Sequence, residues 1–103
     1  MPSKPPILFP IEAKLLTELG ERLRLARLRR KLSAETVAAR VGVSRATLSR
    51  AEQGAPSVTI GVYLRILAVL GLEEDVTQVA ADDRLGRKLQ DLGLPIRRRA
   101  KKS

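Results

Sequence analysis

Residues 44–54 contain two arginines, Arg45 and Arg50, and the pattern of this segment predicts a short helix. Its apolar side chains fall on one side at helical spacing, which leaves Arg45, Ala46, Ser49 and Arg50 pointing outward. A guanidinium can donate hydrogen bonds to O6 and N7 of guanine together, and a methyl group can contact thymine. These residue types therefore predict recognition of base edges.

The composition argues against catalysis. The chain of 103 residues has neither histidine nor cysteine, which removes the commonest general base, metal ligands and thiol nucleophile. No paired carboxylates fall in a plausible pocket, and no Gly-rich phosphate loop occurs. We therefore expect no enzyme activity, no metal and no cofactor. One Phe and one Tyr supply few stacking platforms, so RNA binding is weakly supported.

The outward arginines need a rigid frame, and residues 33–54 predict one. Ser33 and Ser44 are suited to cap the N-termini of two short helices, because their hydroxyls can accept from free amides. Gly42 ends the first helix, and Gly54 closes the second. Two helices joined by so short a corner must cross at a steep angle, which is a helix-turn-helix.

With these residues in place, the chain resembles the Cro/phage-repressor (XRE) family of DNA-binding domains. The resemblance runs from about residue 17 to residue 72, and it is specific because several small and polar residues recur at fixed offsets. The residues that carry it are Leu19-Gly20-Glu21-Arg22-Leu23, Ala26-Arg27, Leu32-Ser33, Val37-Ala38, Val41-Gly42-Val43-Ser44, Thr47-Leu48-Ser49-Arg50 and Glu52-Gln53-Gly54.

The resemblance implies an all-α fold: a five-helix Cro/phage-repressor-like helix-turn-helix domain, here with an additional C-terminal helix and a basic tail. It also implies a homodimer on a palindromic, double-stranded DNA operator. Two residues depart from the family. Ala34 stands where the family commonly has a Gln that often fixes a phosphate, and Ala51 stands where Ile or Leu is usual.

Roles follow for individual side chains. We assign base reading to Arg45, Ala46 and Arg50. Contacts to the DNA backbone, which position the protein without specifying sequence, are predicted for Ser33, Arg40, Ser44, Thr47, Ser49 and Gln53. The family also pairs an Arg with a Glu at the positions of Arg27 and Glu52. We therefore interpret these two residues as a structural ion pair, not as DNA contacts.

The chain divides into three predicted parts: an N-terminal arm (1–10), the helix-turn-helix DNA-binding domain (11–81), and a C-terminal helix with a basic tail (82–103). Besides those of residues 33–54, helices are predicted for residues 11–31, 60–70, 72–81 and 82–92.

The first predicted helix carries an apolar stripe that should face the core. It consists of Ile11, Leu15, Leu19, Leu23 and Ala26. Gly20 interrupts the helix, and the preferred explanation is close approach of another helix. The helix of residues 60–70 is apolar nearly all round, which predicts the central core helix.

The net charge of +9 points to an anionic partner. The charged residues of 22–50 are all basic except Glu35, whereas those of 51–83 are all acidic except Arg65. This asymmetry in charge indicates a protein that binds phosphate groups through one of its surfaces. No run reaches the length of a membrane span, and the Pro-rich start does not suit a signal peptide, so a cytoplasmic location is expected.

The main hypothesis is a homodimeric, sequence-specific DNA-binding repressor. The pattern from Asp83 to Pro95, followed by an Arg run, resembles the C-terminal end of HipB-like antitoxins. That resemblance implies the antitoxin of a type II toxin-antitoxin module, which autoregulates its operon and binds a HipA-like serine/threonine kinase toxin. The alternative is a stand-alone XRE-family or phage-type transcriptional regulator without a toxin partner.

Overall fold

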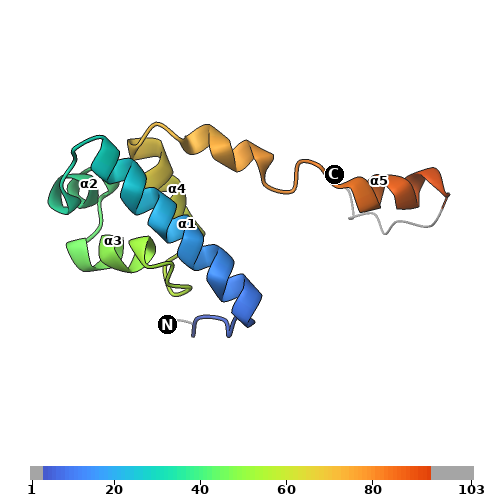
Figure 1. The fold of residues 1–103 in the computed structure, drawn as a ribbon, viewed down its shortest axis with the longest axis horizontal. Helices are drawn as coiled ribbons and strands as arrows, with labels where there is room; N and C mark the ends of the chain where they lie inside the picture. The colour runs from blue at the N-terminus through green and yellow to red at the C-terminus, as the bar shows by residue number, and fades with distance from the viewer. Residues whose placement is uncertain (1–3, 94–103) are drawn as a thin grey trace.

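The computed structural model describes residues 4–93, and every regular element in that range is a helix (Figure 1). The five α-helices are α1 (Pro10–Arg29), α2 (Ala34–Val41), α3 (Arg45–Glu52), α4 (Ile60–Val69) and α5 (Arg84–Asp91). A 3₁₀-helix, η1 (Glu73–Gln78), lies between α4 and α5. The predicted all-α fold, five helices followed by one more, is confirmed. Residues 1–3 of the predicted arm and 94–103 of the predicted tail lie outside the described residues.

Helix α1 is a long helix with a defined start and stop. Pro10 occupies its first turn, and the Glu12 carboxylate accepts from the amide of Phe9 at 3.0 Å. The helix ends at Arg29, two residues earlier than predicted. The physical reason is Lys31, whose φ of 56° is left-handed and cannot continue a helix.

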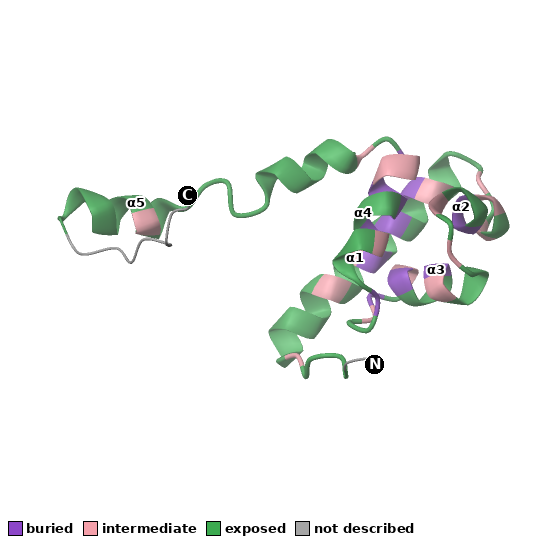
Figure 2. Cartoon of the chain, turned by 180° about the vertical axis from the view of Figure 1, so that it is seen from behind, coloured by how far each residue is buried: buried purple, intermediate pink, exposed green. Residues whose placement is uncertain are grey.

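Helices α1 to α4 enclose one core. Its largest fully buried side chains are Leu23, Val37, Leu48 and Ile66, one from each of the four helices. Figure 2 shows the buried residues gathered where these helices face one another. Each helix therefore contributes one side to a common interior, which fixes their relative positions.

Two predictions about burial, one for the apolar stripe of α1 and one for α4, are wrong in part. Ile11 is 61% exposed and Leu15 is 58% exposed, because the first turns of α1 extend past the helices that cover its second half. Helix α4 is not buried all round either. Ile60 at its start is 84% exposed, and Leu64 lies on the same open side.

Gly20 lies at the crossing of α1 with the end of α3. A Cβ atom at Gly20 would lie 2.6 Å from the backbone nitrogen of Gly54 and 2.7 Å from the carbonyl oxygens of Ala51 and Glu52. The predicted reason for this glycine, close approach of another helix, is therefore confirmed.

The loop from α3 to α4 is fastened by the chain's single tyrosine. Tyr63 is buried, and its hydroxyl donates to the carbonyl of Ala55 at 2.9 Å. Burial raises the pKa of the Tyr63 hydroxyl above its ordinary value, because the charged form would lose hydration. The tyrosine thus joins α4 to the loop that follows α3.

The helix predicted for residues 72–81 forms over a shorter range and as a 3₁₀-helix. Only the short 3₁₀-helix η1 forms, and it ends where Val79 is extended and Ala80 takes a φ of 59°. Helix α5 then begins at Arg84 and is capped by Asp83, whose carboxylate accepts from the backbone amide of Gly86 at 3.0 Å. It stands apart from the four-helix core and leaves its leucines exposed (Figures 1 and 2).

Candidate nucleic-acid interface

Helices α2 and α3 are set at their angle by local hydrogen bonds. Ser33 and Ser44 each cap a helix, accepting at 3.0 Å from the amides of Thr36 and Thr47. Between them, Gly42 has a φ of 90°, and the amides of Gly42 and Val43 both donate to the carbonyl of Ala38. The predicted helix-turn-helix geometry is confirmed.

Helix α3 has one buried and one open side. Leu48 and Ala51 have no exposed surface, whereas Arg45, Ala46 and Arg50 are exposed. Because residues three and four apart share a side, the core contacts of α3 determine which residues face outward. The structure thus brings the three predicted base-reading residues together on the outer side of one helix.

The residues predicted to contact the DNA backbone lie within α2 and α3 or cap the ends of these two helices. The Thr47 hydroxyl accepts from the Arg50 guanidinium at 3.2 Å, and the side-chain amide of Gln53 donates to the Ser49 hydroxyl at 3.1 Å. The hydroxyls of Ser33 and Ser44 serve as caps of their own helices, which leaves the helix N-termini, with their free amides, at the surface. The DNA contacts assigned to these side chains stay predictions.

Arg40 lies at the end of α2, with its side chain exposed. Its carbonyl accepts a hydrogen bond at 3.0 Å from the guanidinium of Arg65, a residue of α4 for which no role was predicted. Arg65 satisfies a free carbonyl at the C-terminus of α2 and places a positive charge where the helix dipole favours one. No spacing in the sequence links residues 40 and 65, so only the packing of α4 against α2 reveals this contact.

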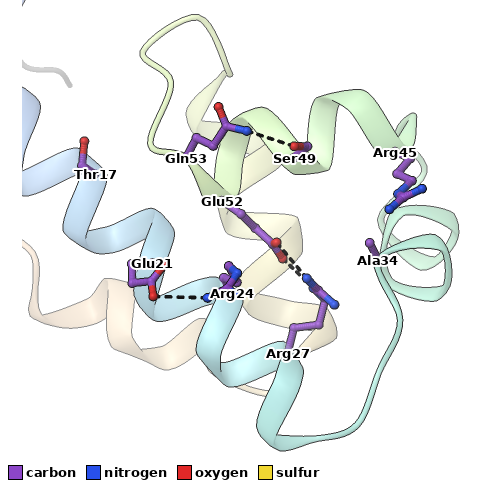
Figure 3. Close-up of a pocket in the computed structure, with 9 residues that line it drawn as sticks. All are labelled: Thr17, Glu21, Arg24, Arg27, Ala34, Arg45, Ser49, Glu52 and Gln53. Carbon is purple, nitrogen blue, oxygen red and sulfur yellow. Dashed lines mark hydrogen bonds and ion pairs between the residues drawn. The ribbon is translucent and has the colours of Figure 1, made fainter.

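Arg27 and Glu52 form a two-pronged ion pair between α1 and α3 (Figure 3). The Arg27 Nε donates to Glu52 Oε2 at 2.7 Å, and Nη2 donates to Oε1 at 3.1 Å. A third donor, Nη1, reaches the carbonyl of Leu32 at 3.0 Å in the turn before α2. One guanidinium therefore joins α1, the turn and the end of α3.

This pair is well shielded from solvent. The side chains of Arg27 and Glu52 are 12% and 8% exposed. The hydrogen bond that Arg27 donates to Glu52 is the largest influence on the pKa of Arg27 and raises it, against the opposing effect of burial. Glu52 therefore points inward to Arg27, and the pair holds α3 against α1.

An open hollow lies between α1 and α3, next to the exposed side of α3 that carries Arg45. Figure 3 shows that α1 contributes Thr17, Glu21 and Arg24, where Glu21 and Arg24 pair at 3.3 Å. On the other side, α3 contributes Arg45 and Ser49. No local pattern in the sequence indicates a site role for Thr17 or Arg24, because their proximity to α3 depends on the crossing angle of the two helices.

The side chains at this surface are hydrogen-bond donors and fixed positive charges. Guanidinium, hydroxyl and amide groups can donate hydrogen bonds to phosphates and base edges. Among residues 4–93, no three His, Cys, Asp or Glu side chains are grouped so that they could hold a metal ion. Within the same residues, no helix is both long and apolar enough to cross a membrane.

Comparison with known proteins agrees with this geometry. A family model described as a helix-turn-helix domain matches residues 18–81, more than half of the chain. The match runs from within α1 to just past η1, and so it includes α2, the turn and α3. No curated protein matches the chain.

Proposed function

The chain belongs to the helix-turn-helix domain family and is a DNA-binding transcriptional regulator, and we propose that it is a sequence-specific repressor acting as a homodimer. The family is one of DNA-binding domains, which are typically not enzymes. One observation supports sequence-specific reading most directly. Helix α3 keeps Leu48 and Ala51 in the core while Arg45 and Arg50 remain open to solvent.

In the proposed complex, α3 lies in the major groove. Arg45 and Arg50 donate to guanine edges, and Ala46 contacts a thymine methyl group. The phosphates on either side are held by Ser33, Arg40, Ser44, Thr47, Ser49 and Gln53. This assignment gives every exposed side chain of α3 a contact with either a base or a phosphate.

We further propose that two copies bind a palindromic operator, with half-sites about 34–36 Å apart. Exposed apolar side chains at the C-terminal end support association, because a single copy leaves Val79, Leu85 and Leu92 largely uncovered. Covering them with the same surface of a second copy would give a two-fold symmetric dimer, which matches the symmetry of a palindrome.

Arg50→Ala tests base reading. We expect it to remove discrimination at one base pair of the operator, a loss of about 1–3 kcal/mol. The operator would first be selected from random DNA, and fluorescence anisotropy would then compare it with single-base variants. Arg40→Ala is the matched control, because loss of a phosphate contact should weaken binding to every sequence alike. Equal weakening by Arg50→Ala on all sequences would contradict base reading.

DNA affinity should fall steeply as salt is added, because each neutralised phosphate releases counterions. The slope of log K against log salt should be about −0.9 for each phosphate that an arginine or lysine neutralises, including the one assigned to Arg40 in each copy. Anisotropy titrations at several salt concentrations would measure this slope. A slope near zero would mean that the basic side chains around α3 do not meet phosphates.

A more specific role is that of an antitoxin whose DNA binding autoregulates its operon. We place DNA binding in residues 11–81 and partner binding in residues 82–103, in a cytoplasmic protein. The support is the HipB-like pattern from Asp83 to Pro95, together with the exposed leucines of α5. The expected partner is a HipA-like serine/threonine kinase toxin.

The antitoxin role would be tested by isolating the tagged protein from its host. A kinase-like protein should accompany it, and Leu85→Asp together with Leu89→Asp should release that protein while operator binding by the regulator continues. If no kinase accompanies the wild-type protein, the function is that of a stand-alone regulator.

A further inference from the structure

Glu35 is the only acid in the basic segment of residues 22–50, and it lies beside a predicted base-reading residue. The Arg45 Nη1 is 3.0 Å from the Glu35 Oε2, so the two side chains form an ion pair. The pair joins the first turn of α2 to the first residue of α3 and bridges the turn between them. Figure 3 shows Arg45 beside Ala34, the residue that precedes Glu35.

Both helix ends favour this arrangement. Glu35 lies in the first turn of α2, where the helix dipole favours a negative charge. Arg45 begins α3, where the dipole disfavours its positive charge, so a nearby carboxylate offsets an unfavourable position. The pair therefore gives Arg45 a preferred direction before any DNA is present.

Fold stability does not explain this pair. The Arg45 and Glu35 side chains are 69% and 64% exposed, and exposed ion pairs contribute little to folding. A carboxylate beside the recognition helix also repels phosphate, which weakens binding to all DNA. An acid at this position therefore opposes general affinity, and it needs another role.

We propose that Glu35 is a positioning residue that sets the specificity of Arg45. One edge of the Arg45 guanidinium is held by the carboxylate, and its remaining N–H groups point to a single base position. Without the carboxylate, the flexible arginine would also reach neighbouring bases or phosphates, and discrimination would fall. This inference rests on the proposed function, because it refines how α3 reads the operator.

Glu35→Gln and Glu35→Ala test the proposal in two backgrounds, wild type and Arg45→Ala. Fluorescence anisotropy would measure binding to the operator, to its single-base variants and to unrelated DNA. In the wild-type background, both substitutions should tighten binding to unrelated DNA severalfold, because a repulsive charge is removed. They should also lower discrimination at one base pair by about tenfold. In the Arg45→Ala background, the tightening should persist and the loss of discrimination should vanish.

Glu21→Gln is the matched control, because Glu21 also forms an exposed ion pair near α3 but with Arg24, which has no base-reading role. It should change affinity slightly and leave discrimination intact. Unchanged discrimination in both Glu35 variants, with DNA binding intact, would overturn the inference alone. An equal loss of discrimination in the Arg45→Ala background would also overturn it, because Glu35 would then touch a base itself. Absence of any sequence preference in the wild-type protein would instead overturn the proposed function.

Discussion

Glu52→Ala is expected to lower the free energy of unfolding by about 3 kcal/mol or more. The substitution leaves the Arg27 guanidinium poorly exposed and without its two-pronged partner, and a shielded charge without a partner is costly. It also removes one of the contacts that fasten the end of α3 to α1. Urea denaturation followed by circular dichroism, at one fixed protein concentration, would measure the change.

Glu21→Ala provides the comparison for this experiment. Glu21 pairs with Arg24 at 3.3 Å, but both side chains are about half exposed, so the loss should stay below about 1 kcal/mol. If Glu52→Ala instead unfolded at the wild-type urea concentration and bound new DNA sequences, Glu52 would be a DNA contact.

Gly20→Ala is expected to destabilise the fold by about 2 kcal/mol or more, although alanine is the better helix former. The new methyl group would overlap the backbone of Gly54, Ala51 and Glu52, and backbone atoms cannot move aside as a flexible side chain can. Helices α1 and α3 would have to separate, which also disturbs the Arg27–Glu52 pair. The midpoint of thermal or urea unfolding would report the loss.

Gly61→Ala is the matched control in the same fold. Gly61 is also helical, but the nearest atom to its added Cβ would be the Thr59 hydroxyl, at 3.8 Å. Relief of glycine's conformational entropy should therefore raise the free energy of unfolding by up to about 1 kcal/mol. Opposite signs for the two substitutions are the expected result. Equal stabilisation by both would mean that α1 and α3 do not approach closely at Gly20.

Features that depend on a few neighbouring residues could be predicted from the sequence. The caps at Ser33 and Ser44 and the left-handed Gly42 follow from local amide and carbonyl needs, so the helix-turn-helix was predictable. The contact of Arg65 with the carbonyl of Arg40, and the pairing of Glu35 with Arg45, were not. They join separate helices, and their distances depend on crossing angles that no local pattern contains.

Burial was predictable only where a helix has neighbours along its whole length. The apolar periodicity of α1 is continuous, but Ile11 and Leu15 lie beyond the helices that cover Leu23. Likewise, a helix was predicted over residues 72–81, yet only Glu73–Gln78 form one, and it is a 3₁₀-helix. Periodicity shows which side of a helix is apolar, and packing decides how far along the chain that side is covered.

The fluorescence of Tyr63 can report on the structure of the segment between α3 and α4. The sequence has one tyrosine and no tryptophan, so all intrinsic ultraviolet fluorescence beyond phenylalanine comes from the hydroxyl-bearing ring that holds Ala55. Its folded-state pKa is raised by burial, so the stability it contributes is complete below the ordinary tyrosine pKa of about 10 and is lost as the pH rises through the raised value. Any event that loosens the segment between α3 and α4, whether alkali or an approaching duplex, would change the emission of this ring without an added label.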